Sequence, residues 1–170
     1  MKVIYFLMFF SFVLMSCQTE KNVSKYPSTV GDIEFDPKLD DADFKKCIPE
    51  KLVTLQYYQG NPGFNYRGEK LAIEEKLKKE NIFSKKNITG YFTVRFIVNC
   101  DGKAGLFRGQ HMDSDFKEKV LDQDLENKLL LFTKSLDGWV PKEMKGRVKI
   151  GYYQYLTYKI KNGKVSEVLP

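Results

Sequence analysis

The sequence predicts an α+β domain: an antiparallel sheet of three to four strands with two helices packed on one face. Two kinds of pattern lead to this class. Two segments alternate apolar and polar residues with period two, which predicts strands, and two others place apolar residues three and four positions apart, which predicts helices. A chain of 170 residues is long enough for one such domain with a core of its own.

The first helix and the first strand follow each other closely. A helix is predicted over Arg67–Lys79, with Ile73 and Leu77 on its apolar face. Ile88–Cys100 is the clearest strand, and its alternation predicts one buried and one solvated face. The buried face is Phe92, Val94, Phe96, Val98 and Cys100, and the solvated face is Tyr91, Thr93, Arg95 and Asn99.

A hairpin follows that strand directly. Asp101-Gly102 favours a type I′ turn, in which both central residues have positive φ. The chain is therefore expected to return as a strand from Lys103 to about Gly109. The glycines Gly105 and Gly109 predict that this strand is weak or bulged.

The second helix runs to about Leu136, with Asp122 or Asp124 as its N-cap. A single apolar stripe recurs along it, made of Leu121, Leu125, Leu129, Phe132 and Leu136. Gly138 is expected to be the left-handed C′ residue that ends it. Trp139 follows and is interpreted as a core anchor between the helix exit and the sheet.

The last two strands form a second hairpin. Val148–Ile160 alternates over its whole length, so one long strand is predicted. Asn162-Gly163 is a type I′ signal, and Lys164–Leu169 is expected to pair back as a short final strand.

The start of the chain has the pattern of an export signal. Lys2 gives Met1–Ser16 a positive end, and the apolar run that follows is shorter than the about 20 residues that span a bilayer. The sequence Leu-Met-Ser-Cys that ends at Cys17 resembles a bacterial lipobox. The resemblance implies cleavage before Cys17, acylation of its thiol with palmitate-type chains, and membrane attachment through this N-terminal lipid. The alternative is a plain secretory signal followed by an unrelated cysteine.

Three regions are predicted from these features: a lipoprotein signal peptide (1–16), a tether with an N-terminal extension (17–45) and the α+β domain (46–170). Gln18 to about Tyr26 is polar and unpatterned, as a tether is. The acidic stretch Asp32–Asp43 is interpreted as a solvated surface segment. It lacks the glycine and the closing glutamate of an EF-hand loop.

Cys47 and Cys100 are the two cysteines left in the exported domain. Export favours a disulfide between them, since oxidising compartments preserve disulfides; two buried free thiols are the alternative. Two cysteines and one distant histidine cannot complete a tetrahedral metal shell. No metal or other cofactor is predicted.

Catalysis and nucleic-acid binding are not expected. His111 is the only histidine and is assigned to a surface loop, and the sequence contains no nucleophile elbow, phosphate-binding glycine loop or HExxH motif. The lysines alternate with acidic residues instead of forming the basic stripe of a nucleic-acid-binding protein.

From Tyr58 to about Val165 the chain resembles the TonB C-terminal domain of Bacteroidota. The matching segments are Gly68-Glu69, Gly90-Tyr91-Phe92-Thr93-Val94-Arg95-Phe96-Ile97-Val98, Asp101-Gly102-Lys103, the helix Leu125–Leu136, Gly138-Trp139-Val140-Pro141 and Tyr158-Lys159-Ile160. The family implies a domain that adds an extended segment of an outer-membrane receptor to its sheet edge. The strand that would receive it corresponds to Lys149–Ile160.

The resemblance implies a non-catalytic protein- or peptide-binding lipoprotein of the cell envelope, accessory to outer-membrane transport and anchored at the outer membrane facing the periplasm or the surface. The candidate edge residues are Gly151, Tyr153, Tyr155 and Thr157. Tyr153 and Tyr155 are expected to be exposed. Pairing of Lys164–Leu169 with this strand would close the edge. The alternative function is a structural envelope lipoprotein with no dedicated ligand.

Overall fold

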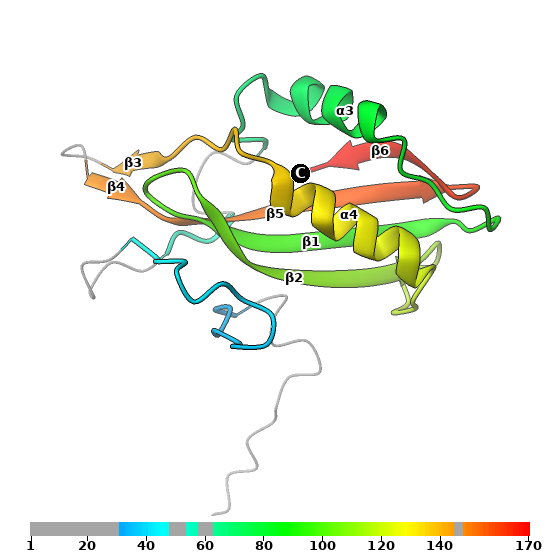
Figure 1. Cartoon of the computed structure of the whole chain (residues 1–170), viewed down its shortest axis with the longest axis horizontal. Helices are drawn as coiled ribbons and strands as arrows, with labels where there is room; N and C mark the ends of the chain where they lie inside the picture. Colours follow the sequence, from blue (N-terminus) through cyan, green and yellow to red (C-terminus); the bar gives the residue numbers. More distant parts are fainter. Residues whose placement is uncertain (1–30, 48–53, 58–62, 145–147) are drawn as a thin grey trace, which may run out of the picture.

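The computed structural model describes residues 31–47, 54–57, 63–144 and 148–170. Within these residues a four-stranded antiparallel sheet carries two helices on one face, as Figure 1 shows. The predicted α+β class, antiparallel sheet and pair of helices are confirmed. The proposed signal peptide, Cys17 and the tether up to Tyr26 lie outside the described residues.

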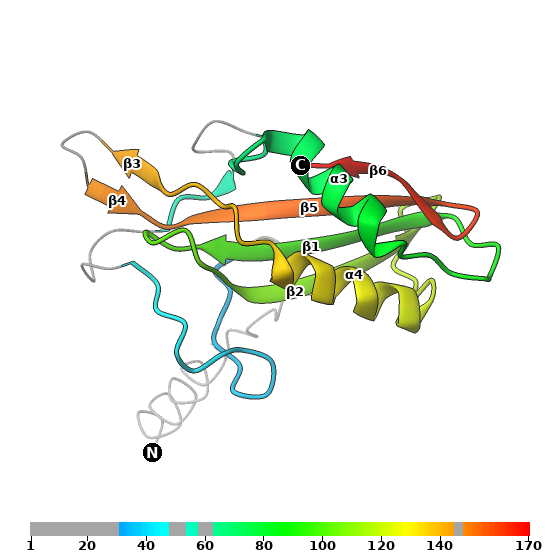
Figure 2. The ribbon, with the colours of Figure 1, turned by 45° about the horizontal axis from the view of Figure 1, so that its top comes forward.

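The sheet has the order β2-β1-β5-β6 (Figure 2). Strand β1 (Gly90–Val98) pairs over its full length with β5 (Tyr152–Lys161), and on its other side with β2 (Ala104–Asp113). Strand β6 (Lys164–Leu169) pairs with the second half of β5. The final strand therefore lies at one edge of the sheet and β2 at the other.

The two hairpins turn differently. Asn162 and Gly163 have φ of 51° and 76°, as the predicted type I′ turn requires. At the β1–β2 hairpin only Gly102 has positive φ (77°), its N–H donates to Asn99 O at 3.0 Å, and Asn99 N–H donates to Lys103 O at 2.8 Å. This is a three-residue loop with one left-handed position, so the type I′ prediction was wrong there.

Strand β2 carries the predicted bulge and is longer than expected. Arg95 of β1 pairs with Arg108 and Ile97 pairs with Gly105, so β2 holds one extra residue between them. Leu106 in this interval has a φ of 54°. The bulge turns the Leu106 side chain to a buried position on the face opposite the helices.

The long strand predicted over 148–160 is divided at Gly151, which corrects that prediction. Strand β4 (Val148–Ile150) pairs with β3 (Lys142–Met144), away from the main sheet. Gly151 O accepts a hydrogen bond from Leu55 N–H at 3.0 Å, and a Cβ at Gly151 would lie only 3.3 Å from Val98 O. The close backbone approach explains the glycine at the break.

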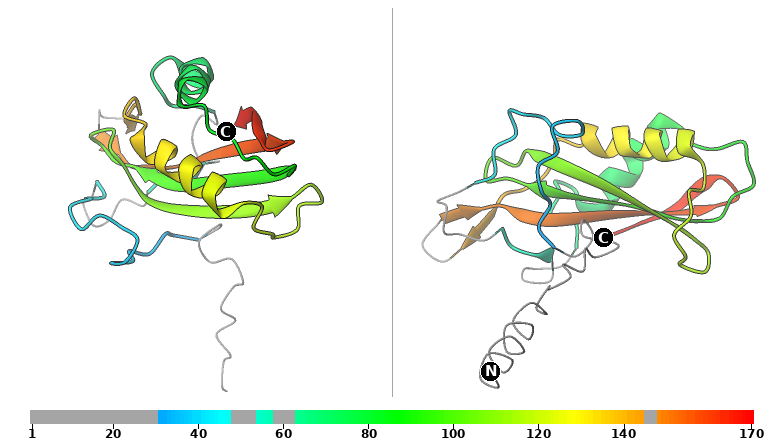
Figure 3. Two further views of the ribbon diagram at one scale, coloured as in Figure 1. Left: turned by 45° about the vertical axis from the view of Figure 1, so that its right-hand side comes forward. Right: turned by 90° about the horizontal axis from the view of Figure 1, so that it is seen from below.

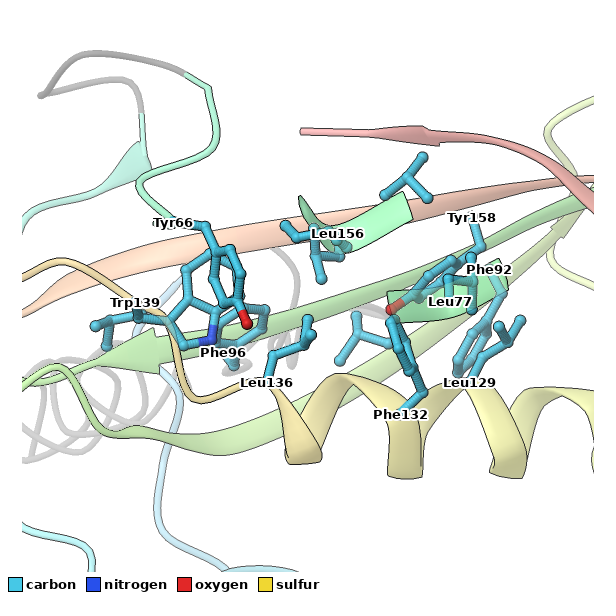
Figure 4. Close-up of a cluster of buried hydrophobic side chains, with 14 of the residues drawn as sticks. Tyr66, Leu77, Phe92, Phe96, Leu129, Phe132, Leu136, Trp139, Leu156 and Tyr158 are labelled. Carbon is cyan, nitrogen blue, oxygen red and sulfur yellow. The ribbon is translucent and has the colours of Figure 1, made fainter. Parts of the chain in front are cut away.

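The main core lies between the sheet and the helices α3 (Glu69–Glu80) and α4 (Gln123–Ser135). The side chain of Asp122 caps α4 by accepting from Asp124 N–H at 3.3 Å. Figure 4 shows the side chains of α4 directed toward the strands. The buried core contains Leu77, Phe92, Phe96, Leu125, Leu129, Phe132, Leu156 and Tyr158.

Trp139 is a core anchor, as predicted. It is buried, and its ring lies 5.0 Å from the ring centroids of both Tyr66 and Phe96 (Figure 4). Gly138 does not act as a left-handed C′ residue, since the C-cap of α4 is Leu136 in an extended conformation. Glycine is needed at 138 because any Cβ there would strike the Tyr66 ring.

The face of the sheet opposite the helices, here called the second face, is partly covered by residues 31–47. The left view in Figure 3 shows this segment across the sheet from the helices. Ile33 is buried with Ile97, Leu106 and Tyr153, and Phe44 packs against them. The expectation of a solvated face on β1 was therefore wrong at Arg95, which is 2 % exposed, and also at Thr93 and Asn99.

Several connections hold this segment, among them a hydrogen bond, a disulfide and an ion pair. Arg95 Nη2 donates to Gly31 O at 2.7 Å, and Cys47 forms a disulfide with Cys100. Between them, Arg108 forms a bidentate pair with Asp40, with both N–O distances 2.7 Å. The Asp40 side chain is 1 % exposed, which corrects its assignment to a solvated segment. Residues predicted to be a tether and extension thus pack as part of the domain from Gly31 onward.

We expect the combined substitution Cys47→Ser and Cys100→Ser to lower the free energy of unfolding by about 4 kcal/mol, because the bridge closes a loop between residues 53 positions apart. Urea unfolding followed by circular dichroism measures the change. The parent protein in reductant should lose the same amount. Free alkylation of both thiols in the native, unreduced protein would contradict the disulfide.

We expect Asp40→Asn to destabilise the protein by about 2–3 kcal/mol at pH 7, because Arg108 loses its buried carboxylate. The hydrogen bond from Arg108 lowers the pKa of Asp40 below its usual value. Its contribution is therefore complete above the unfolded-state pKa of about 4 and is lost as the pH falls through the folded pKa. Urea unfolding from pH 2.5 to 7 should show a shallower acid decline in the variant. Asp43→Asn, at an exposed position, is the charge-matched control.

Candidate functional site

Strand β5, which the sequence indicates as the peptide-receiving edge, is an interior strand. It pairs with β1 along its length and with β6 from Thr157 to Lys161. Near its start, Tyr153 N–H donates to Leu55 O at 2.9 Å. Of the two outcomes that the sequence leaves open, the structure shows the closed edge, because the Asn162-Gly163 turn folds the last strand onto Thr157–Lys161.

The candidate edge residues are mainly structural. Tyr153 is fully buried, its hydroxyl donates to Asp32 Oδ1 and accepts from Ile33 N–H, both at 3.0 Å, and the Arg95 guanidinium lies 4.1 Å from its ring centroid. Burial raises the pKa of Tyr153 to about 12. The expected exposure of Tyr153 was wrong, because the N-terminal segment covers it.

The other three candidate edge residues are Tyr155, Thr157 and Gly151. Tyr155 is half-buried, with its ring 5.5 Å from that of Tyr57 in an edge-on arrangement. Thr157 shares a hydroxyl–hydroxyl hydrogen bond of 3.0 Å with Thr93 on the neighbouring strand. Gly151 is buried at the break between β4 and β5. These contacts join strands and leave little surface for a partner.

The structure instead places an open edge at β6. On its outer side, among the described residues, β6 has a single bridge, between Lys164 and Phe83, next to the hydrogen bond from Ser84 N–H to Gly163 O at 2.8 Å. Past Lys164, the described part of the chain contributes no strand on that side. The other edge strand, β2, is flanked by the Asp40–Arg108 pair and by a bridge from Met112 to Glu118.

A groove of about 570 Å³ lies between this edge and α3, and we call it the α3–β6 groove. Its apolar lining comes from Leu77 and Ile82 on the helix side and from Val165 and Val168 on the strand. Phe83, which is 41 % exposed, closes one end. Figure 1 shows α3 running alongside β6. An edge strand beside an apolar groove can bind an extended segment by backbone pairing and take its alternate side chains into the groove.

Charges of both signs border the groove. Glu167 lies 3.5 Å from Lys70 and 3.8 Å from Lys159, and Lys70 also lies 3.6 Å from Glu74. These side chains are about two-fifths exposed, so each pair contributes little to stability. They remain available to exchange partners with a bound chain.

A second hollow of about 460 Å³ adjoins the groove and shares Asn81, Ile82 and Phe83 with its lining. Here Ser84 Oγ donates to Asp122, and Lys86 Nζ lies 3.3 Å from Asp122 Oδ1. The hydrogen bond from Ser84, followed by that from Lys86, lowers the pKa of Asp122. Because Asp122 also caps α4, this cluster fixes the loop after α3 to the start of α4.

His111 lies on β2, not in a surface loop as the sequence suggests. Its Nδ1 is 3.4 Å from Oε2 of the buried Glu126 of α4. Glu126 Oε1 accepts from Leu121 N–H at 2.9 Å. The pair ties β2 to the first turn of α4.

The described residues contain no helix long and apolar enough to cross a membrane, and no group of three or more His, Cys, Asp or Glu side chains placed to hold a metal ion.

Comparison with known proteins gave no relative for this chain: no family model, no curated protein and no solved structure matches it.

Sequence reasoning missed the α3–β6 groove although two of its signals are visible. Asn162-Gly163 predicts that Lys164–Leu169 folds back, and a final strand that folds back becomes the new edge. Ile82 and Phe83 are adjacent apolar residues directly after the first helix. The way α3 lies beside β6 depends on tertiary packing, which these local signals do not specify.

Proposed function

We propose that the protein is a lipid-anchored envelope lipoprotein whose domain is a non-catalytic module that binds an extended protein segment by strand addition at β6. The open β6 edge beside the apolar α3–β6 groove is the observation that carries the proposal. The resemblance of the sequence to the TonB C-terminal domain supports the same mode of binding. The receiving strand is β6 in place of the Lys149–Ile160 segment.

The groove favours a particular ligand chemistry. A segment paired with β6 would direct every second side chain into the apolar lining, so those positions should be apolar. The intervening positions would meet charges of both signs, among them Lys164 and Glu167. The ligand class is therefore an extended peptide with period-two apolar residues.

We expect 12-residue peptides selected from a random display library against the full chain to show this pattern. Phe83→Glu should weaken their binding at least tenfold, because it places a charge in the groove. Leu71→Glu, on an exposed position of α3 outside the groove lining, is the matched control and should leave affinity unchanged. Isothermal titration calorimetry gives both affinities.

Hydrogen exchange of the same complexes places the ligand. Bound peptide should slow exchange of backbone amides in Lys164–Leu169. Protection confined to β2 would contradict strand addition at β6. Failure to select any binder would favour the alternative, a structural envelope lipoprotein with no dedicated ligand.

We expect Cys17→Ser to abolish lipid attachment, leaving the protein unprocessed or releasing it from membranes, because the acylated thiol is lost. Membrane fractionation after a carbonate wash, with mass spectrometry of the mature N-terminus, measures the outcome. Ser16→Ala keeps a small residue before the cleavage site and should remain lipidated. A Cys17→Ser protein that is processed and still membrane-bound would place the anchor elsewhere.

A further inference from the structure

Two turns of the protein are built on the same hydrogen-bond plan. In the Asn99–Lys103 turn, Asn99 O accepts from Gly102 N–H at 3.0 Å, and Asn99 Oδ1 accepts from the N–H groups of Asp101 and Lys103, both at 2.9 Å. The residue in the left-handed position is Gly102, with a φ of 77°. Glycine takes that conformation without steric cost.

The Asp113–Lys117 turn repeats these bonds. Asp113 O accepts from Phe116 N–H at 3.1 Å, and Asp113 Oδ1 accepts from the N–H groups of Asp115 and Lys117 at 2.9 and 3.1 Å. Here the left-handed position, with a φ of 60°, holds Phe116. A bulky side chain is strongly disfavoured in this conformation, so the turn tolerates strain that glycine would remove.

Burial does not explain a phenylalanine at position 116. It is 67 % exposed, and one side of it stacks on Tyr91 with ring centroids 5.0 Å apart and planes at 15°. Tyr91 is paired with Met112 on one side and with Lys159 on the other. The Phe116–Tyr91 pair therefore forms an aromatic platform on the second face of the sheet, and the far side of the Phe116 ring is open to a partner.

The chain leaves the described domain from this same face. The backbone oxygen of Gly31 accepts a hydrogen bond from Arg95. Tyr91 precedes Arg95 by four residues on the same face of β1, a separation of about 13 Å along the strand. Thirteen residues separate Cys17 from Gly31, and a chain of that length reaches at most about 50 Å. If Cys17 is lipidated, as proposed above, the platform is held within reach of the bilayer surface.

Charges of both signs lie beside the platform, and the lysines of β5 line a hollow next to it. Lys117, Lys159 and Lys161 lie next to the platform in the turn and on β5, against Asp113, Asp115 and Glu118 in the turn; Lys159 also lies 3.8 Å from Glu167. A hollow of about 140 Å³ next to Tyr91 is lined by Lys159, Lys161 and Ser114, and its described lining includes no carboxylate. Amphipathic aromatic rings settle at the headgroup level of bilayers, and lysines are attracted to anionic lipids.

We infer that the Phe116–Tyr91 platform is a second membrane contact, which lays the second face of the sheet on a bilayer that contains anionic phospholipid. Phe116 enters the interface between headgroups and acyl chains, and Lys159 and Lys161 contact lipid phosphates. The inference rests on the proposed lipid anchor for the proximity of the membrane, but the contact itself requires no acylation.

The test uses the chain from residue 18, without the acylated cysteine, and circular dichroism with thermal unfolding checks that it keeps the fold of the full chain. Its binding to vesicles of phosphatidylcholine with phosphatidylglycerol is measured by sedimentation and compared with vesicles of phosphatidylcholine alone. We expect binding to the anionic vesicles that weakens as salt is raised. Phe116→Gly and Phe116→Asn should each reduce the partition coefficient about tenfold.

Both Phe116 variants suit a left-handed position, so their thermal midpoints should stay near that of the parent and loss of binding cannot be assigned to unfolding. Leu131→Ser removes an equally exposed apolar side chain (65 %) from the helix side and should bind like the parent. The double change Lys159→Gln with Lys161→Gln should abolish the preference for anionic vesicles.

Unchanged vesicle binding of Phe116→Gly, or no binding of the parent, would overturn the inference even if Cys17 is lipidated. Analytical ultracentrifugation tests the other occupant considered for the platform, a second copy of the chain. A parent dimer that Phe116→Gly converts to a monomer would also overturn the inference. A non-lipidated Cys17 with intact vesicle binding would instead refute only the anchor.

Discussion

The pairing of β1 with β5 over nine residues of β1 places two strands at the centre of the sheet with few positions open to water. A central pair buried on one face only could leave its polar side chains solvated. Here Arg95 and Tyr153 lie on the second face and are buried too, so that face needs a cover. Residues 31–47 supply it, and the Asp40–Arg108 pair and the disulfide hold the cover in place.

Local signals predicted most of the secondary structure. The alternation in β1, the leucine stripe of α4 and the Asn162-Gly163 turn each match an observed element, because each depends on side chains near in sequence. Apart from the turn type at Asp101-Gly102, the main errors arose where distant segments meet. In the sequence Gly138 resembles a helix terminator, but in the structure the Tyr66 ring packs against it. Gly151 resembles an ordinary strand residue, but in the structure Leu55 pairs with it.

The candidate site was harder to predict for the same reason. Tyr153 and Tyr155 alternate as exposed strand residues should, but the acidic segment that buries Tyr153 lies about 120 positions earlier and shows no apolar pattern of its own. The groove beside β6 depends on how α3 lies against the last strand. Its position on the helix side of the sheet separates it from the second face, where the chain enters the domain. A partner in the groove and a membrane at the second face would approach opposite sides of the sheet, with Lys159 within reach of both.

The disulfide also determines how the domain would bear tension. A pull applied through the N-terminal segment first loads the Gly31–Arg95 hydrogen bond, then the packing of Ile33 and the Asp40–Arg108 pair. Beyond these, at Cys47, the load passes through a covalent bond to Cys100 at the β1–β2 hairpin. Detachment of residues 31–47 therefore stops at that hairpin. The strands of the central sheet and the helices behind it are protected from force applied through this segment.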